Sequence, residues 1–334
     1  MPVREPRWIT EREAVAAIDL HGAVAAVRDA LRLEHAGSAT TLAKTATQFD
    51  GHGTLHSLGG AGIPSADGPV VGTKSWAHTP GGATPLVTLW DAASGALLAV
   101  VEAFALGQLR TAAISAVATD VMAPPDAEVL AMIGTGKQAL AQVAAVASQR
   151  HLRQVRVHSP TAEHRAAFCS LVAARLADVD VVDCPDVRAA AQGADVVTTA
   201  TRSRTPILDA SMVGTRGHVN ALGSITDDRR ELDPSIVAAA GLLVSDSPTA
   251  AMTLSSEFDG AAAIVSLSAI VAKSVAPGVD GAGLTVFKAM GLGLADVAIA
   301  AAVLSTTGAA GGGRPITAPA RAAPRLFSTG DDTT

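Results

Sequence analysis

The sequence is poor in aromatic residues and lacks tyrosine: only 3% of its 334 residues are aromatic, although 49% are hydrophobic. The core must therefore be built mainly from Ala, Val and Leu, which suits helices that pack closely on a buried sheet. The chain also lacks an excess of basic residues, since its formal net charge is −6. Because a nucleic-acid partner requires clustered Lys and Arg to neutralise phosphates, this charge argues against one.

Cysteines and long apolar runs are scarce as well. The two cysteines, Cys169 and Cys184, make no disulfide framework and lack the spacing of a metal site, so we expect no metal and a cytoplasmic location. The longest apolar region, residues 292–304, is interrupted by Gly293 and Asp296, and we expect no membrane span. The N-terminal residues carry mixed charge and lack the apolar core of a signal peptide.

The first third of the chain combines helices and short strands, and the whole chain is long enough for two domains. Apolar residues recur at helical spacing over residues 11–35, which predicts one amphipathic helix. Residues 38–102 indicate strands and glycine turns, including a hairpin in "PLVTLWDAASGALLAVVEA". Residues 106–122 indicate a long Ala-rich helix, which the prolines of "APPD" end.

From residue 123 onward the pattern becomes β-α-β. The segments "EVLAMIG", "QVRVHS", "VDVVDC", "DVVTTAT", "GHVNALG" and "LLVSD" predict strands, and apolar strands that alternate with helices imply a parallel sheet covered on both faces. We therefore predict a Rossmann-type, doubly wound α/β domain over residues 123–290. It would be inserted in a discontinuous α+β domain formed by residues 1–122 and 291–310. Residues 311–334, rich in Gly, Ala and Pro, are expected to form a flexible tail.

The strongest local motif is "VLAMIGTGKQALAQV", in which Gly134, Gly136 and Ala139 satisfy G-x-G-x-x-A between a predicted strand and a predicted helix. Gly134 permits a tight turn, Gly136 lets the backbone approach a pyrophosphate, and Ala139 allows close helix–strand packing. A glycine turn without a ligand is the simpler alternative. The strand–turn–helix setting favours a dinucleotide site.

The segment after the next strand, "VRVHSPTAEHR", bears on the choice of cofactor. NAD sites usually carry an Asp or Glu there for the ribose hydroxyls, and here the first acid is Glu163. Ser159 and Thr161 could bind a 2′-phosphate, and His158 or Arg165 could face its charge. We therefore expect NADP(H) rather than NAD(H), although these residues could also form only a turn and a helix cap.

Two further segments carry candidate substrate residues. In "VVGTKSWAHTPGG", Lys74, Trp76 and His78 alternate and would share one face of a strand, as a pocket wall or as a solvated face. Partial burial lowers the pKa of a lysine in general, and such a side chain can protonate a carbonyl or an imine. The acids Glu257 and Asp246 are expected to serve only at a helix end and in a turn, respectively.

Arg110, in "ALGQLRTAAISAVAT", lies in the first turns of a helix, where a cation opposes the helix dipole. Bidentate binding of a substrate carboxylate would explain its presence, and a surface salt bridge, for example to Glu102, is the alternative. Lys44 and His56 precede Lys74 in the glycine-rich region and could line the same pocket, although a lone His is more often simply solvated or hydrogen-bonded.

Several segments, taken in order, resemble the ornithine cyclodeaminase/mu-crystallin family over residues 10–305. They are "LGQLRTAAISAVAT", "IGTGKQA", "GADVVTTAT", "GHVNALGS", "RRELD" and "LTVFKAMGLGLADVA". The resemblance implies a discontinuous dimerisation and substrate domain with an inserted Rossmann domain, and a homodimer. The family includes cyclodeaminases, alanine and opine-type dehydrogenases, and reductases of cyclic ketimines such as Δ1-pyrroline-2-carboxylate.

The resemblance also implies roles for individual residues. The family's active-site lysine falls on Lys74 and its carboxylate-binding arginine on Arg110. A second basic residue at the carboxylate falls on Lys44, where the family more often has Arg. The positions that match the cofactor site are Thr111, Thr135 and Gln138 at the pyrophosphate, and Thr199, Ala200, Thr201, Leu222 and Gly223 beside the adenosine and nicotinamide.

The sequence departs from the family in "GSITDDRRELD". Cyclodeaminases and the related alanine dehydrogenases read "GSD" or "GGD" there, so that Ile225 stands where their catalytic Asp would be. Isoleucine cannot accept a proton. Asp227 and Asp228 come two and three residues later, and we expect them to be turn residues paired with Arg229 and Arg230.

We therefore expect an NAD(P)H-dependent reductase of cyclic α-imino acids, of the Δ1-pyrroline-2-carboxylate or Δ1-piperideine-2-carboxylate type. Arg110 and Lys44 would hold the carboxylate, and Lys74 would hydrogen-bond or protonate near the imine. Trp76 would form part of the pocket wall. One alternative is a cyclodeaminase, or an amino-acid or opine-type dehydrogenase, in which a later aspartate of the loop or His56 replaces the missing acid. Another is a non-catalytic NADP-binding protein.

Overall fold

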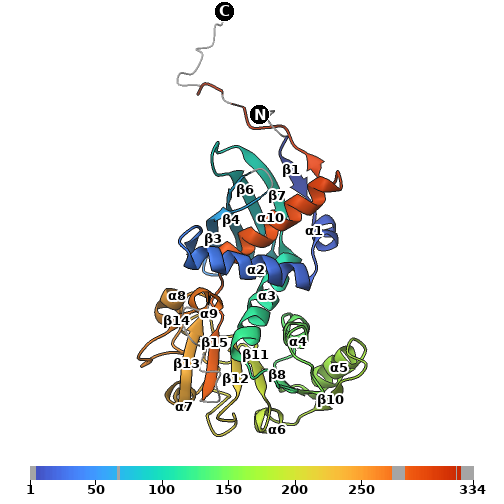
Figure 1. Ribbon diagram of the computed structural model, residues 1–334, viewed down its shortest axis with the longest axis vertical. Helices are drawn as coiled ribbons and strands as arrows, with labels where there is room; N and C mark the ends of the chain where they lie inside the picture. The colour runs from blue at the N-terminus through green and yellow to red at the C-terminus, as the bar shows by residue number, and fades with distance from the viewer. Residues whose placement is uncertain (1–4, 66–67, 273–282, 321, 325–334) are drawn as a thin grey trace, which may run out of the picture.

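Two eight-stranded sheets form the two parts of the molecule (Figure 1). The computed structural model describes residues 5–65, 68–272, 283–320 and 322–324, and both strand counts refer to these residues. The first sheet has the order β16-β1-β7-β6-β4-β3-β2, with β5 beside β4, and the second has the order β10-β9-β8-β11-β12-β15-β13-β14. In the described part of the chain, no helix combines the length and the apolar character that a membrane span requires.

The second sheet is parallel at every pairing between its described strands. Its strands are β8 (Val129–Ile133), β9 (Gln154–His158), β10 (Asp180–Asp183), β11 (Val196–Thr199), β12 (His218–Ala221), β13 (Ala240–Ser245), β14 (Val265–Ser266) and β15 (Leu284–Lys288). The helices between them are α4 (Ala139–Ala147), α5 (Ala162–Ala173), α6 (Val187–Ala191), α7 (Pro234–Ala239), α8 (Pro248–Leu254) and α9 (Leu267–Val271). This arrangement confirms the predicted Rossmann-type fold class, with parallel strands joined by crossover helices.

The first sheet is mostly antiparallel, and it combines residues from both ends of the chain. Its strands are β1 (Arg7–Ile9), β2 (Thr40–Phe49), β3 (Gly53–Ile63), β4 (Val70–Thr79), β5 (Gly82–Ala83), β6 (Leu86–Asp91), β7 (Leu97–Glu102) and β16 (Arg314–Pro315). The predicted hairpin corresponds to β6 and β7. Helices α2 (Leu20–His35) and α10 (Gly293–Ala309) cross one face of the sheet (Figure 1).

Helix α10 lies directly on the backbone of β3. A Cβ added to Gly293 would stand 2.3 Å from Gly59 N, so only glycine fits at this contact. The close approach brings the first turn of α10, which contains Asp296, beneath the strands that carry the candidate substrate residues.

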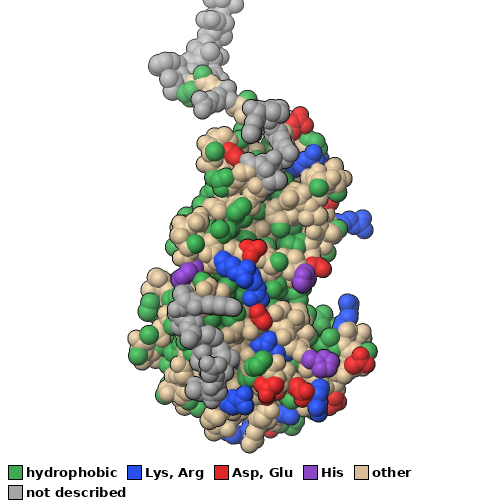
Figure 2. Space-filling model, viewed as in Figure 1, with side chains coloured by type: hydrophobic (Ala, Val, Ile, Leu, Met, Phe, Trp, Pro, Cys, Tyr) green, Lys and Arg blue, Asp and Glu red, His purple; other side chains and the backbone are tan. Residues whose placement is uncertain are grey.

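Helix α3 (Phe104–Met122) extends from the first part into the second (Figure 1). Its alanines are buried on several sides, which explains why an Ala-rich segment occurs here: neighbouring helices can approach closely. Arg150 caps its C-terminal end by donating to Thr119 O at 2.9 Å and Ala123 O at 2.8 Å. On the face shown in Figure 2, Lys and Arg side chains lie beside Asp and Glu side chains at the narrow region between the two parts.

Two expectations about the ends of the chain differ from the structure. The helix predicted over residues 11–35 is two helices, α1 (Glu11–Ala17) and α2, because Ile18 is extended and Asp19 starts a new helix by accepting from Gly22 N at 2.8 Å. The tail expected from residue 311 contains strand β16, which pairs with β1 through backbone hydrogen bonds. Residues 325–334 of that tail lie outside the described residues.

Candidate active site

A cavity of about 860 Å³ lies between the two parts of the molecule. Strands β2, β3 and β4 and the start of α3 line it from the first part, through Lys44, Leu58, Trp76, Arg110 and Thr111. From the second part it is lined by segments that follow the carboxyl ends of β8, β9, β11, β12 and β15. In doubly wound α/β proteins, this edge of the sheet is where ligands bind.

The turn between β8 and α4 has the features of a dinucleotide site. Gly134 has φ +106°, and a Cβ there would stand 2.7 Å from Ala200 O, so the turn requires glycine. A Cβ on Gly136 would meet nothing within 4 Å, which leaves its backbone open to a ligand. Gln138 lines the cavity, and its buried Oε1 has no hydrogen-bond partner in the described structure. These features fit a bound pyrophosphate at the start of α4.

The structure brings most of the predicted cofactor residues together at the cavity. Its lining includes Thr111, Gly134, Thr135, Gly136, Gln138, Ser159, Thr161, Ala200, Thr201, Leu222 and Gly223. Ala139 is instead fully buried at the start of α4, where a small side chain permits the close packing expected of it. Thr199 requires a correction: its side chain is buried and donates to Glu231 Oε2 at 2.9 Å, behind the cavity.

Of the four residues expected around a 2′-phosphate, three line the cavity and the fourth, Arg165, does not. Ser159 and Thr161 line the cavity, and the Thr135 hydroxyl lies 3.2 Å from that of Ser159. Arg165 does not face an open site, because its Nε contacts Asp183 Oδ1 at 2.6 Å. His158 also lines the cavity, and its Nδ1 lies 3.1 Å from the Cys184 carbonyl.

Lys74 and Arg110 meet at a single buried carboxylate. Lys74 Nζ lies 2.9 Å from Asp296 Oδ1, and Arg110 Nε lies 3.2 Å from Asp296 Oδ2. Although burial opposes ionisation, Arg110 and then Lys74 hold the pKa of Asp296 below its usual value. The partner of Arg110 is therefore Asp296, and the alternative pairing with Glu102 is wrong: Glu102 accepts from Trp8 Nε1 and Glu11 N.

One glycine leaves room for Lys74, and another, with φ +101°, forms the turn beside Arg110. A Cβ on Gly107 would stand 2.9 Å from Lys74 Nζ, and one on Gly291 would stand 3.6 Å from a terminal nitrogen of Arg110. The turn at Gly291 is held by Asp246, which accepts from Met290 N at 2.7 Å and from Gly291 N at 3.0 Å. Asp246 thus fixes the part of the cavity wall beside the guanidinium, a more specific role than the turn residue expected from the sequence.

Lys44, His56 and Trp76 lie near this cation pair, and of the three only Lys44 and Trp76 line the cavity. The rings of His56 and Trp76 stack with centroids 4.7 Å apart, and Lys74 Nζ lies 5.5 Å from the Trp76 ring centroid. Burial, and then the positive charge of Arg110, lower the pKa of Lys44. Burial, and then Lys44, lower the pKa of His56, which keeps its imidazole neutral near pH 7. Lys44 and Arg110, two neighbouring cations in a partly desolvated site, are well suited to bind an anion.

The charge of the cavity is opposite to that of the chain. Among the described residues that line it there is no Asp or Glu, whereas the basic residues are Lys44, Arg110, Lys137, Arg202 and Arg229. Ile225 lines the cavity at the position where an acid would stand in the cyclodeaminases. The cavity is therefore suited to anionic ligands, and its described lining offers no carboxylate as a proton acceptor.

The aspartates of the "GSITDDRRELD" loop point elsewhere. Asp227 and Asp228 are exposed and do not line the cavity. Asp228 lies 3.3 Å from Arg204 and accepts from the Thr226 hydroxyl. Arg230 pairs with Asp259 at 2.9 Å. Asp228 and Arg230 thus take their ion-pair partners from other segments, and for these two residues the expected pairing is wrong. The Thr226 hydroxyl and, to a smaller extent, the charges of Arg204 and Arg229 lower the pKa of Asp228.

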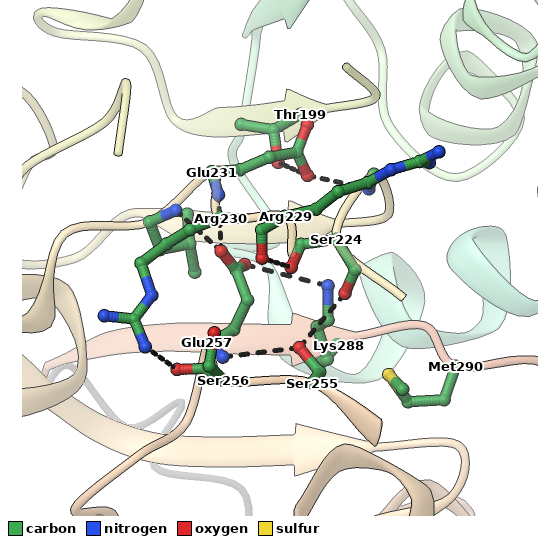
Figure 3. A network of polar contacts seen from close by, with 12 residues as sticks. Thr199, Ser224, Arg229, Arg230, Glu231, Ser255, Ser256, Glu257, Lys288 and Met290 are labelled. Carbon is green, nitrogen blue, oxygen red and sulfur yellow. Dashed lines mark hydrogen bonds and ion pairs between the residues drawn. The ribbon is translucent and has the colours of Figure 1, made fainter. Parts of the chain in front are cut away.

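Sequence reasoning missed four buried charges next to the cavity: Asp296, Glu231, Glu257 and Lys288. Asp296 had a visible signal, since it is the one charged residue in the apolar segment "GLGLADVAIAAAVL". Glu231 and Lys288 had no such signal in the sequence, because charged residues beside strand ends are common. Glu257 was expected at a helix end, but it accepts from Leu232 N at 3.0 Å and lies 3.7 Å from Lys288 Nζ (Figure 3).

Comparison with known sequences identifies relatives over much of the chain. The sequence model of the ornithine cyclodeaminase/mu-crystallin family matches residues 10–309. The chain is 35% identical to ketimine reductase mu-crystallin of Mus musculus over 216 residues, which are 64% of this chain and 66% of that protein, just under two thirds of its length. It is 30% identical over 225 residues to Δ1-pyrroline-2-carboxylate reductase of Bacillus cereus, covering 64% of this chain and 68% of that protein.

A solved structure with the same fold extends the likeness to nearly the whole chain. The iminosuccinate reductase of Paracoccus denitrificans, in complex with NAD+, superposes with a TM-score of 0.85 at 26% sequence identity. The superposition covers 94% of this chain and 99% of that one. Both parts of the molecule therefore have counterparts in one solved protein.

Proposed function

The chain belongs to the ornithine cyclodeaminase/mu-crystallin family, and from this premise we propose that it is an imine reductase. Its substrate would be a cyclic α-imino acid of the Δ1-pyrroline-2-carboxylate or Δ1-piperideine-2-carboxylate type, reduced to the cyclic amino acid. The names of the mouse and Bacillus cereus relatives support this class of reaction. The observation that carries the proposal is that Arg110 and the dinucleotide-type turn line the same cavity, while Lys74 lies buried next to it and shares the Asp296 carboxylate with Arg110.

The residues of the second part fit a nicotinamide dinucleotide. Gly134 and Gly136 leave the backbone accessible at the start of α4, and the described lining carries no acid that would repel phosphates. We also propose NADP(H) over NAD(H). Among the described lining residues after β9 there is no carboxylate that could accept hydrogen bonds from the ribose hydroxyls, and Ser159 and Thr161 line that position instead. When bound, the reduced nicotinamide would supply a hydride to the imine carbon.

The side chains of this protein would bind the substrate and supply the proton. The terminal nitrogens of Arg110 and the Lys44 ammonium would hold the carboxylate, since Nε of Arg110 faces Asp296 at 3.2 Å. Lys74 would donate its proton to the imine nitrogen as the carbon accepts the hydride, so that C=N becomes H–C–N–H. Asp296, which accepts a hydrogen bond from Lys74 at 2.9 Å, would orient its ammonium until that transfer.

The lining of the cavity argues against amino-acid deamination. A cyclodeaminase or amino-acid dehydrogenase needs a base, and Ile225 together with the acid-free described lining supplies none. His56, stacked on Trp76 and kept neutral, is the remaining candidate base; like Lys74, it lies beside the cavity and is not among the residues that line it. Reduction needs a proton donor and an anion site, and both are present.

The test compares two reactions of the purified protein. We expect NADPH to be consumed in proportion to Δ1-pyrroline-2-carboxylate, with about 100- to 10,000-fold lower kcat for Lys74→Met and unchanged NADPH affinity. Ornithine should release no ammonia under the same conditions. Steady ammonia release without net change in the cofactor would overturn the proposal, and so would full activity of Lys74→Met.

We also propose that the protein is a homodimer that pairs through the edge of its first sheet. Strand β2 is the last strand of that sheet, and its residues are exposed along most of its length. Leu42 and Phe49 on β2 and Leu55 on the adjoining β3 are large exposed apolar side chains. A long exposed edge with an apolar patch is unfavourable in a monomer and is well suited to a second copy of the same chain.

A further inference from the structure

The buried carboxylate of Glu231 lies directly behind the cavity, because it is hydrogen-bonded to the lining residues Thr201 and Gly223 without lining the cavity itself. Glu231 has no exposed surface, and it stands between the carboxyl ends of the adjacent parallel strands β11 and β12. It belongs to neither strand, since it follows them in the "RRELD" segment. A charge in such a position requires several hydrogen bonds to offset its loss of hydration.

Each oxygen of this carboxylate accepts one backbone N–H and one hydroxyl. Oε1 accepts from Thr201 N at 2.6 Å and from the Thr201 hydroxyl at 2.7 Å. Oε2 accepts from Gly223 N at 2.7 Å and from the Thr199 hydroxyl at 2.9 Å. One oxygen therefore holds the segment after β11, and the other holds the segment after β12 as well as the last residue of β11.

The direct backbone hydrogen bonds between β11 and β12 end close to these two segments. The ladder between the strands continues to Leu222 N, which donates to Thr199 O at 2.9 Å. Beyond that point the backbones of Thr201 and Gly223 are joined through Glu231, in place of further direct ladder bonds. The contact is tight, because a Cβ on Gly223 would stand 2.2 Å from Thr201 O. Ala200, Thr201, Leu222 and Gly223 all line the cavity, so the carboxylate shapes its wall from behind.

Glu231 is itself held in place by a second buried acid. Glu257 accepts from the backbone N–H groups of Glu231 and Leu232, and its other oxygen faces Lys288 Nζ at 3.7 Å (Figure 3). Lys288, on β15, is fully buried; burial lowers its pKa, and the charges of Glu257 and then Glu231 oppose that shift. The network thus connects a third strand of the sheet to the ends of β11 and β12.

We propose that Glu231 is a positioning residue of the dinucleotide site, which sets the distance between the two strand ends that face the cofactor. This inference rests on the proposed binding of a nicotinamide dinucleotide in the cavity. It requires a carboxylate and not an amide, because all four partners are donors and each oxygen accepts a fixed backbone N–H. In Glu231→Gln, either orientation of the amide would direct its NH2 group at one of these N–H groups.

The experiment compares Glu231→Gln with Asp195→Ala by titrating each purified protein with NADPH. Asp195 is the matched control: its Oδ2 accepts from Glu128 N and Val129 N, both at 2.9 Å, at the opposite edge of the same sheet. Losing charge-assisted hydrogen bonds of this kind should weaken NADPH binding by Glu231→Gln about ten- to hundredfold. Asp195→Ala should lower the melting temperature but change the Kd for NADPH by less than about twofold. At saturating NADPH, the KM of Glu231→Gln for the imine should be unchanged, since the carboxylate-binding end of the cavity is not altered.

Each result of these titrations either supports or overturns the positioning role of Glu231. Wild-type Kd in Glu231→Gln, or an equal loss of binding in both variants, would overturn the positioning role. Should Glu231→Gln fail to fold, Thr199→Val removes one donor from Glu231 with little change of shape, and it should weaken NADPH binding about three- to tenfold. An unchanged Kd in that variant would then overturn the proposal. A wild-type protein that binds neither NADPH nor NADH would instead refute the proposed function.

Discussion

The carboxylate of Asp296 determines the charge of the substrate end of the cavity. It contacts both Lys74 and Arg110, so the three groups together carry one net positive charge, to which Lys44 adds another. A bound carboxylate would compensate part of this charge, and its hydration loss would be offset by partners that are already desolvated. The same arrangement leaves Lys74 with a proton to donate. One buried acid in α10 thus accounts for both halves of the proposed chemistry, binding and protonation.

At the residue scale, His218 predicts how stability depends on pH. It is fully buried on β12, and burial lowers its pKa from 6.5 to about 4, with Asn220 opposing the shift and Arg150 adding to it. The unfolded chain therefore binds a proton at a higher pH than the folded one, and stability is lost as the pH falls from 6.5 towards 4. We expect this residue to cost about 2 kcal/mol of unfolding free energy between pH 7 and pH 5.

Urea denaturation at pH 7 and at pH 5 measures this dependence. The comparison is with His218→Gln, which cannot take up a proton and should lose most of the difference between the two pH values. Equal pH dependence in both proteins would show that other groups are responsible.

At the element scale, replacing either of two glycines in helix α10 by alanine should have opposite effects on stability. Gly293→Ala places a Cβ 2.3 Å from Gly59 N, so the helix must move away from β3, at a cost of about 1–3 kcal/mol. Gly308→Ala, near the other end of the same helix, meets nothing within 4 Å and should stabilise by about 0.5–1 kcal/mol. Thermal unfolding of both variants distinguishes them. Because Asp296 follows Gly293 by less than one turn, only Gly293→Ala should also lose imine reduction.

The elements that could be predicted from the sequence are those with local signals. The G-x-G-x-x-A turn at Gly134 and the alternation of strands and helices gave the second sheet, since each depends on residues a few positions apart. The break at Ile18 was missed because apolar spacing continues across it, although Asp19 is a good cap. The partner of Lys74 could not be found, because 222 positions separate it from Asp296 and the two meet only after α10 packs on β3.

At the scale of the whole molecule, the exposed edge of the first sheet predicts the state of assembly. Burying Leu42, Phe49 and Leu55 against a second copy would remove large apolar side chains from water, at about 25 cal/mol per Å². Leu55, which is 52% exposed, is the best position to disrupt, since a charge there would be buried without a partner in the dimer.

Light scattering should give the wild-type protein twice the chain mass of 33.4 kDa, and Leu55→Glu a single chain mass. Met252→Glu is the matched control, because Met252 is 64% exposed but lies on α8 in the other part of the molecule, and this variant should remain dimeric. A monomeric wild-type protein, or a dimer that Met252→Glu disrupts and Leu55→Glu does not, would contradict pairing through this edge.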